Sequence, residues 1–363
     1  MMALMAPDND TRWMKRCFEL ARRGAGMVSP NPMVGAVLVH KNRTIGEGWH
    51  ERWGGPHAEV NCFKSVAPDD ERLIPESVLY CNLEPCSHFG KTPPCASLVT
   101  EKRVGKVVIA NTDPNPLVAG SGIEMIRKAG ILVETGLLEE EGYRLNRAFF
   151  TKINEKRPYI ILKWAQTADG FLGRPGERTS ISAPPALRLA HRWRSESDAI
   201  LVGATTATTD NPLLDTRFYF GKNPLRILLD GAGSVPADSH LLSDNRETLI
   251  FGPARPGAPD CKRFTGAHAR TSVQEIAARL YLDNIGILYV EGGAGVLQQF
   301  ADTGYWDEIR ILESRQVLGS GIKAPAIPAG SDLFTTFKVG ADQVNIFFRQ
   351  SVHHTDKSDV PVT

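Results

Sequence analysis

The order of hydrophobic and polar residues in the first half of the chain predicts alternating helices and strands. Between Thr11 and Arg23 apolar residues recur every three or four positions, which is typical of a helix with one buried face. Helices are also predicted to begin at His57 and at Ser121. Strands are predicted over four short segments, residues 34–39, 44–49, 78–83 and 107–111. Strands that alternate with helices at this spacing predict a layered α/β domain.

The second half of the chain shows the same alternation. Strands are predicted over residues 159–164, 199–203, 225–229 and 285–290, and a helix over residues 184–194. The segment 285–290 is the last one along the chain with a strong strand pattern. Residues 146–157 are dense in charge and poor in apolar positions, so we expect the boundary between two domains there. The run Glu291–Gly295 follows a strand and precedes a helical pattern. Its glycines could bring backbone N–H groups close to a phosphate, or could serve only the backbone angles of the turn.

Composition narrows the class of protein. A length of 363 residues fits two domains, each with its own core. Lysine and arginine total 42 against 41 acidic residues, which gives no electrostatic reason to expect a nucleic-acid partner or a membrane surface. Neither an apolar run of membrane-spanning length nor a signal peptide is recognisable, so a cytoplasmic protein is expected.

Cysteines are too few for a disulfide framework. The chain has 6 cysteines, and we expect four of them to be small buried residues: Cys17, Cys62, Cys81 and Cys261.

The remaining two cysteines join a histidine in the strongest chemical signal of the chain. His57 and Glu59 lie in a Pro-His-Ala-Glu run, and Cys86 and Cys95 follow at the two ends of a Pro-rich segment. One imidazole and two thiolates can hold Zn²⁺ and leave a fourth position for water, and a glutamate two residues after the histidine is the general acid/base of zinc deaminases. Both metal-binding segments are predicted to open a helix, whose positive end favours thiolates.

Two other interpretations of these residues are weighed against a catalytic site. The cluster could be a closed structural zinc site, with His88 as its fourth ligand, or it could bind no metal. Structural sites often pair cysteines two to four residues apart, whereas eight residues separate Cys86 from Cys95 and no C-x-x-C pair occurs. The pattern therefore favours hydrolytic removal of an amino group from a ring, with Glu59 transferring the protons.

The same segment resembles a known family. Its long gap between cysteines and its Thr-Pro-Pro run, together with Pro30–Gly35 and the turn Asp113–Pro116, resemble the bifunctional riboflavin-biosynthesis deaminase/reductase family. Other zinc deaminases usually carry two residues between the cysteines. The resemblance extends over residues 11–349. It implies a zinc-dependent pyrimidine deaminase domain over residues 11–150, with a three-layer cytidine-deaminase-like fold, and an NADPH-dependent reductase domain over residues 157–352, with a dihydrofolate-reductase-like fold.

The resemblance also implies substrates. The deaminase would act on 2,5-diamino-6-ribosylamino-4(3H)-pyrimidinone 5′-phosphate, and the reductase would convert the opened ribose into the ribityl chain of 5-amino-6-(5-phosphoribitylamino)uracil. Asn31 and His50 would line the pyrimidine pocket, and His88, Lys91 and Thr92 would reach the ribose phosphate. The family often has an arginine where this chain has Lys91, and a lysine contacts phosphate as a point charge instead of bidentately.

Matched positions in the second half imply a cofactor site and a substrate site. NADPH would contact Ala165, Ser180, Thr206, Asp210, Gly231, Gly293, Ala294, Gly295, Val296, Leu297, Gln298 and Gln299. The substrate would contact Arg178, Arg194, Leu214, Arg217 and Glu291, with the arginines on its phosphate. Lys163 is a candidate catalytic residue that orients or protonates the substrate, and a strand lysine on a solvent face is the competing interpretation.

The chain departs from the family pattern in its second half. Thr179 and Ser180 stand where a tryptophan is often found, the turn after Lys163 reads Gln-Thr-Ala, and residues 230–266 are rich in Gly and Pro. One alternative is therefore a zinc deaminase with a C-terminal binding or dimerising domain. A nucleic-acid deaminase or a non-catalytic zinc module would instead predict a basic stripe with interleaved aromatic residues. We expect a homo-oligomer, since domains of this kind often bury a sheet face by self-association.

Overall fold

The computed structural model describes residues 7–88, 93–116, 119–265 and 271–350, and the chain divides into two compact units, Met1–Arg157 and Pro158–Thr363. The predicted boundary stretch, residues 146–157, ends where the two units divide. Most of it forms the helix α6 (Arg147–Glu155), which directly follows α5 (Glu139–Leu145). Phe150 and Thr151 of α6 are buried, since few apolar residues suffice to anchor a short helix.

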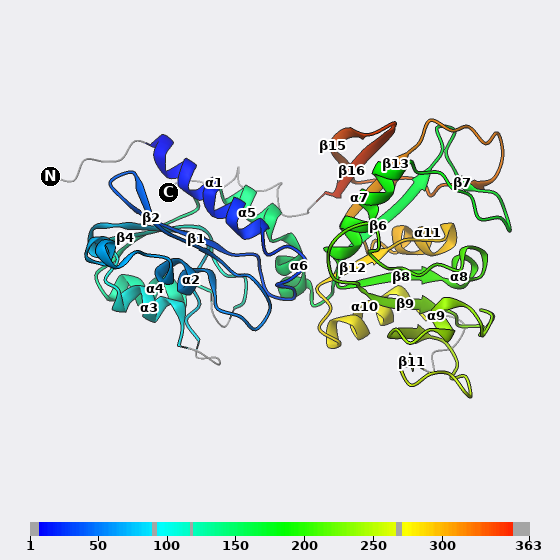
Figure 1. Cartoon of the computed structure of the whole chain (residues 1–363), viewed down its shortest axis with the longest axis horizontal. Coiled ribbons are helices and arrows are strands. Elements are labelled where there is room, and N and C mark those ends of the chain that lie inside the picture. The colour runs from blue at the N-terminus through cyan, green and yellow to red at the C-terminus, as the bar shows by residue number, and fades with distance from the viewer. Residues whose placement is uncertain (1–6, 89–92, 117–118, 266–270, 351–363) are drawn as a thin grey trace, which may run out of the picture. The chain divides into compact units, whose positions relative to one another are not determined.

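The first unit is built on a mixed sheet of five strands (Figure 1). Its order is β2 (Arg43–Trp49), β1 (Gly35–His40), β3 (Val78–Leu83), β4 (Lys106–Asn111) and β5 (Leu132–Thr135). Strand β1 runs antiparallel to both neighbours, whereas β3, β4 and β5 are parallel. Strand β5, which the sequence did not predict, has a single buried residue, so its apolar signal is weak.

Helices cover both faces of this sheet and bury a separate core on each. One core joins β1 and β3 to α1 (Pro7–Arg22), through buried residues such as Phe18 and Tyr80. The other core lies beneath three helices, α2 (Ala58–Lys64), α3 (Cys95–Glu101) and α4 (Ser121–Lys128). The helix–sheet–helix arrangement confirms the predicted three-layer domain (Figure 1). A 3₁₀ helix, η1 (Pro68–Glu76), connects α2 to β3.

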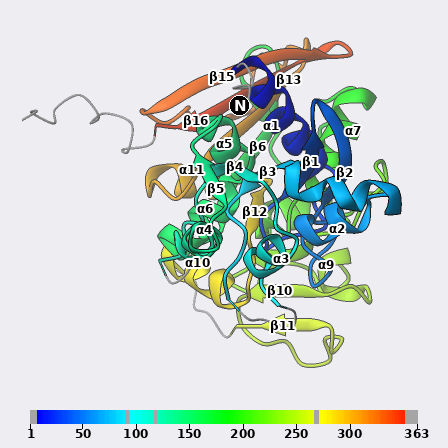
Figure 2. The same ribbon diagram turned by 90° about the vertical axis from the view of Figure 1, so that its left-hand side faces the viewer.

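The second unit contains a nine-stranded sheet, with β11 at one edge and β15 at the other (Figure 2). Its order is β11 (Lys262–Phe264), β10 (Thr248–Phe251), β9 (Leu225–Leu229), β8 (Ala199–Gly203), β12 (Ile287–Val290), β6 (Tyr159–Gln166), β13 (Glu308–Glu313), β16 (Asp342–Arg349) and β15 (Ser331–Val339). The seven strands from β11 to β13 are parallel, and β16 and β15 continue antiparallel.

Three strands of this sheet, β13, β15 and β16, were not predicted and follow residues 285–290, the last segment with a strong strand pattern. Strand β13 escaped prediction because charged residues occupy its buried positions, where Arg310 donates to Glu308 at 2.6 Å. Strands β15 and β16 expose much of their surface, so neither has the apolar run of a buried strand. A separate short ladder pairs β7 (Phe171–Gly173) with β14 (Ile322–Lys323).

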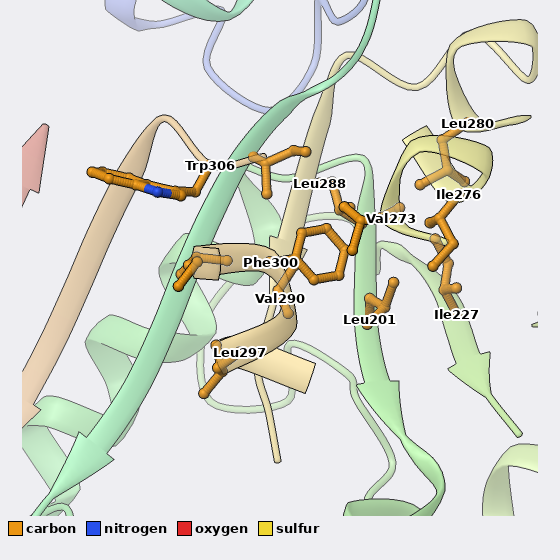
Figure 3. Packing of buried hydrophobic residues seen from close by; sticks show 14 of the residues in the cluster. Leu201, Ile227, Val273, Ile276, Leu280, Leu288, Val290, Leu297, Phe300 and Trp306 are labelled. Carbon is orange, nitrogen blue, oxygen red and sulfur yellow. The ribbon is translucent and has the colours of Figure 1, made fainter. Parts of the chain in front are cut away.

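One face of the second sheet packs against two helices, α10 (Val273–Leu282) and α11 (Ala294–Asp302). Phe300 of α11 is fully buried among Leu288, Val290 and Leu201 of the sheet (Figure 3). Helix α7 (Pro184–Ser195) lies over the opposite face, where Arg310 stacks 4.9 Å from the ring of Trp193. The shorter helices are α8 (Ala204–Asp210) and α9 (His240–Ser243).

The cysteines largely follow expectation. All six are free thiols, and Cys17, Cys62 and Cys81 are fully buried. Cys261 is only partly buried, which corrects the prediction for that residue, because it lies at the sheet edge just before β11. Within the described part of the chain no helix combines the length and apolar composition needed to cross a membrane.

Candidate active sites

His57, Cys86 and Cys95 converge in the first unit. His57 is the N-cap of α2, Cys95 is the first residue of α3, and Cys86 lies in the loop after β3. The Nδ1 atom of His57 is 3.5 Å from Sγ of Cys86 and 3.4 Å from Sγ of Cys95, and the three ligand atoms lie within 4.8 Å of one another. Both metal-binding segments open a helix, as predicted, but the second helix begins at Cys95 and not directly after Cys86. It is the backbone N–H of Cys95 that donates to Sγ of Cys86, at 3.3 Å.

The cluster fits a zinc ion with an open position. Ligand atoms at ordinary Zn–N and Zn–S distances of a tetrahedral site are about 3.5 Å apart, as the two measured N–S separations are. Among the described residues the cluster contains three side chains, and His88 is exposed and outside it. A hydrogen bond from Cys95, assisted by one from His57, lowers the pKa of the Cys86 thiol despite its burial. These observations favour a three-ligand site over the closed structural one.

Glu59 lies in the first turn of α2, next to the ligands. Its side chain is buried, with 3% of the residue exposed. Burial, followed by the nearby charge of Cys86, raises the pKa of Glu59 above its usual range. A carboxyl group whose pKa moves toward neutrality is suited to accepting and returning a proton.

His50 lies beside the zinc ligand His57, and Asn31 contacts His50. His50 Nδ1 lies 2.9 Å from the carbonyl oxygen of Pro56, which can only accept, so Nδ1 carries the proton. His50 Nε2 then accepts from the Asn31 amide at 3.2 Å. Burial lowers the pKa of His50 and keeps the ring neutral, and its centroid lies 5.5 Å from that of His57. Lys91 and Thr92 lie outside the described residues.

Glu84 is a buried acid beside this site whose role was not foreseen. Its carboxylate accepts four backbone N–H groups, from Asp113, Gly120, Gly122 and Ile123, at 2.9 to 3.2 Å. A Cβ on Gly122 would come within 2.0 Å of the Pro85 carbonyl, so α4 approaches the Cys86 loop closely. Glu84 therefore fixes the Asp113 loop against the segment that carries Cys86. The sequence signal was an acid directly before the Pro-Cys pair.

The second unit contains a cavity of about 860 Å³. Most of the residues that the family resemblance implied lie in its wall: Lys163, Ala165, Arg178, Ser180, Arg194, Thr206, Asp210, Leu214, Arg217, Glu291, Gly293, Ala294, Gly295, Val296, Leu297 and Gln299. Gly231 lies outside this lining, in the turn after β9. Gln298 also lies outside it, where its amide donates to Asp302 at 2.6 Å on the surface of α11.

Glu291 joins two cations in the cavity wall. One carboxylate oxygen accepts from Lys163 at 3.1 Å, and the other accepts from two nitrogens of Arg194, at 3.0 and 2.6 Å. A third nitrogen of Arg194 donates to the carbonyl of Asp215 at 3.0 Å. Burial opposes the charge, but Arg194 and Lys163 outweigh it and lower the pKa of Glu291 to about 2. Lys163 is therefore a buried cavity residue with an ion-pair partner, which overturns its interpretation as a solvent-facing strand lysine.

His191 also lines the cavity and was not foreseen. It lies one helical turn before Arg194 on α7, and that spacing within the predicted helix was the available signal. Its Nδ1 accepts from the backbone N–H of Phe218 at 3.4 Å. Burial, with the charges of Arg194 and Arg217, lowers the pKa of His191 to about 4, so this ring is neutral near pH 7.

The glycine turn lies at the opening of α11. Gly293 is the N-cap, and Gly292 has a φ of 120°, which favours glycine. A Cβ on Gly293 would be 3.0 Å from the hydroxyl of Thr206, so there is little room for a larger residue. The first backbone N–H groups of α11 border the cavity, and such groups bind phosphate readily.

Comparison with known proteins identifies both halves of the chain. Residues 158–339 match the family of RibD C-terminal domains, and residues 7–111 match the zinc-binding region of cytidine and deoxycytidylate deaminases. Riboflavin biosynthesis protein RibD of Aquifex aeolicus is 37% identical over 325 residues, covering 88% of this chain and 90% of that protein. The protein of the same name from Bacillus amyloliquefaciens is 39% identical over 329 residues, covering 88% of this chain and 87% of that protein.

Solved structures agree with the sequence relatives. A diaminohydroxyphosphoribosylaminopyrimidine deaminase/5-amino-6-(5-phosphoribosylamino)uracil reductase from Thermotoga maritima superposes with a TM-score of 0.86 at 34% identity, covering 94% of this chain and 99% of that one. RibD of Acinetobacter baumannii superposes with a TM-score of 0.82 at 29% identity, covering 95% and 99%. The predicted pairing of a cytidine-deaminase-like domain with a dihydrofolate-reductase-like domain is confirmed.

Proposed function

This chain belongs to the RibD family of bifunctional deaminase/reductases of riboflavin biosynthesis, and we propose which of its residues bind the substrates and carry out the two reactions. The observation that carries the proposal is the His57, Cys86 and Cys95 cluster with the buried acid Glu59 beside it. The substrate of this site is the diaminopyrimidinone that bears a ribosylamino 5′-phosphate.

His57, Cys86 and Cys95 would hold the zinc ion, which when bound supplies the Lewis acidity that makes water nucleophilic near neutral pH. Glu59 would take one proton from the attacking water and pass it to the ring nitrogen. It would then transfer the second water proton, from the hydroxyl of the tetrahedral adduct, to the departing amine, so that one water is consumed and one ammonia released. The neutral His50 and the Asn31 amide hold the pyrimidine edge. His88, Lys91 and Thr92 contact the ribose phosphate.

The deaminated product is the substrate of the second unit. NADPH supplies a hydride for the anomeric carbon of the opened ribose. Lys163, whose side chain is oriented by its hydrogen bond to Glu291, donates the proton that the adjacent nitrogen takes up, giving the ribitylamino chain. The backbone N–H groups at the start of α11 would hold the cofactor phosphates, and Thr206 and Asp210, which line the same cavity, would contact the cofactor.

Arginines divide into two roles in this cavity. Arg178 and Arg217 contact the substrate phosphate, which guanidinium groups recognise bidentately. Arg194 donates three of its nitrogens to Glu291 and to the Asp215 carbonyl, so its main role is to fix Glu291 and through it Lys163. Leu214 packs against the substrate at the same wall.

A two-step assay tests both activities on one sample. The purified chain is given the diaminopyrimidinone phosphate with and without NADPH, and ammonia release and NADPH oxidation are recorded. Ammonia release in both reactions, with NADPH oxidation that follows deamination, is the expected result. Ammonia release without NADPH oxidation would support a deaminase whose second unit only binds or dimerises.

We also infer that the chain forms a homo-oligomer. Strand β15 is an edge strand of the second sheet and exposes Leu333, Phe334 and Phe337, with 57%, 51% and 39% of each residue accessible. An apolar edge strand is a ready surface for pairing with a second copy. Light scattering of the wild type and of Leu333→Lys tests this, with a smaller particle expected for the variant and equal sizes contradicting the role of β15.

A further inference from the structure

The loop that carries Asn31 is held by buried side chains from distant parts of the first unit. Residues 29–34 are the last part of the connection between α1 and β1, residues 23–34, which has no regular secondary structure. Met33 lies near the end of this loop. Its backbone N–H and its backbone carbonyl are both hydrogen-bonded to asparagine side chains. These asparagines, Asn82 and Asn146, are not among the residues proposed to hold the zinc ion or to contact the substrate.

Asn146 lies at the junction of α5 and α6, 113 residues from Met33 in the sequence. Its side-chain oxygen accepts from the Met33 N–H at 2.8 Å, and its side-chain nitrogen donates to the Met33 carbonyl at 2.9 Å. The amide thus satisfies the donor and the acceptor of one residue, as a neighbouring strand would. Asn146 is 3% exposed, so water does not compete for these bonds.

Asn82 approaches the same loop from β3. Its oxygen accepts from the Gly35 N–H at 2.7 Å, and its nitrogen donates to the Met33 carbonyl at 3.0 Å. The Met33 carbonyl therefore receives one N–H from each asparagine. Asn82 is fully buried, and its strand continues into the loop that carries Cys86. The two amides fix the end of the Asn31 loop relative to the sheet.

The side-chain amides of Asn82 and Asn146, bonded to Met33, are called the clamp below. A short chain of hydrogen bonds connects the clamp to the zinc ligands. Asn31, two residues before Met33, donates to His50 at 3.2 Å. His50 donates in turn to the carbonyl of Pro56, the residue before the ligand His57, at 2.9 Å. The backbone N–H of His50 also donates to the Val34 carbonyl at 2.9 Å. A shift of Met33 would therefore move Asn31 relative to His50.

We propose that Asn146 and Asn82 are positioning residues of the deaminase, which hold the Asn31 amide at the geometry that binds the pyrimidine. The helix pair α5–α6 thereby contributes to substrate binding without touching the substrate. This inference rests on the proposed contact of Asn31 with the substrate, and the experiment separates the two.

The test compares Asn146→Ala and the isosteric Asn146→Asp with a matched control, Asn111→Ala. Asn111 is also a buried asparagine, and its amide ties β4 to α5 through the Glu139 carbonyl at 3.0 Å, but it has no bond to the Asn31 loop. The readouts are the KM and kcat of deamination, the zinc content, and the reductase activity of the same chain. Asn146→Asp keeps the acceptor for the Met33 N–H but loses the donor to the Met33 carbonyl.

Both Asn146 variants should raise the deaminase KM about tenfold. Asn146→Ala leaves the buried Met33 N–H without its partner, and Asn146→Asp places a carboxylate oxygen against the Met33 carbonyl, so the loop shifts in either case. Their kcat should change less than about threefold, and zinc content and reductase activity should match the wild type. Asn111→Ala should leave KM unchanged. In the double variant Asn31→Ala/Asn146→Ala the KM should equal that of Asn31→Ala alone, because Asn146 acts through Asn31.

Each contrary result has one meaning. Wild-type KM in both Asn146 variants, or an equal rise in Asn111→Ala, overturns the clamp. Multiplicative KM effects in the double variant overturn it as well, since they show that Asn146 acts independently of Asn31. If Asn31→Ala itself has wild-type KM, then the proposed substrate contact of Asn31 fails and the clamp fails with it. If Asn31→Ala alone raises KM, the substrate contact stands and only the clamp is lost.

Discussion

The ammonium group of Lys163 lies 3.1 Å from a carboxylate oxygen of Glu291 in the wall of the reductase cavity. The two residues come from neighbouring parallel strands, since Lys163 is on β6 and Glu291 directly follows β12. Both side chains are buried, with 12% and 6% exposed. A charge that is shielded from water is costly without an opposite charge beside it. The ion pair should therefore matter both for the stability of the second unit and for its reductase activity.

Replacing Glu291 should therefore lower both the stability of the second unit and its reductase activity. Glu291→Gln leaves Lys163 and Arg194 as buried cations without their counter-charge, at an expected cost of about 3 to 5 kcal/mol in the free energy of unfolding of the second unit. Urea unfolding of the full chain measures this, and reductase turnover should fall at the same time. Glu196→Gln, which breaks the more exposed pair with Arg192, should cost less than about 0.5 kcal/mol. Equal effects of the two variants would contradict the account.

The same pair makes the second unit sensitive to acid. Because the folded pKa of Glu291 is about 2, below the ordinary glutamate value, the carboxylate contributes stability that is fully present above about pH 5. That contribution, about 3 kcal/mol for this shift, should be lost as the pH falls toward 2. Unfolding curves at several pH values should show a steeper acid loss for the wild type than for Glu291→Gln, which has no proton to bind.

Loss of one zinc ligand should disable one half of the enzyme. Cys86→Ser removes a thiolate from a three-ligand set, so metal content and deamination should both fall to background. Reduction of the deaminated substrate by NADPH should be unaffected, since the cavity belongs to the second unit. Metal analysis and the two separate assays test this. A variant that keeps its zinc would remove Cys86 from the ligand set.

Arg217 tests the placement of the substrate phosphate. Its side chain is 40% exposed at the cavity, where it pairs with Asp215 and stacks 4.8 Å from the ring of Phe218. Arg217→Ala should raise the reductase KM for the phosphorylated substrate at least tenfold, because a charge-assisted contact is lost, while the KM for NADPH stays unchanged. Arg279→Ala, on the surface of α10, is the control and should alter neither KM.

Much of the fold was predictable because local signals and tertiary structure agree. The buried strands β1, β3, β4, β6 and β8 consist mostly of apolar residues. His57 and Glu59 lie within one helical turn, so their proximity is local. Strand β13 was missed because its buried Glu308 and Arg310 satisfy each other, and no rule of hydrophobic pattern detects such a pair. Strand β15 was missed because it is largely exposed.

The candidate sites show the same limit. Motif spacing identified the zinc ligands, but the roles of Glu84 and Asn146 depend on partners up to 39 and 113 residues away and become visible only in the folded chain. Lys163 could not be told from a solvent-facing lysine until Glu291 was placed beside it. Cys86 was expected at a helix start, whereas the start of α3 belongs to Cys95.

The most direct test of the account is Glu59→Gln, which keeps the shape of a buried side chain next to the zinc ligands and removes only its ability to transfer protons. We expect the variant to retain the zinc content of the wild type and to reduce the deaminated substrate with NADPH at the wild-type rate. Ammonia release from the diaminopyrimidinone phosphate should fall at least about a hundredfold. Deamination at the wild-type rate with zinc in place would contradict the assignment of Glu59, and with it the proposed mechanism of the first reaction.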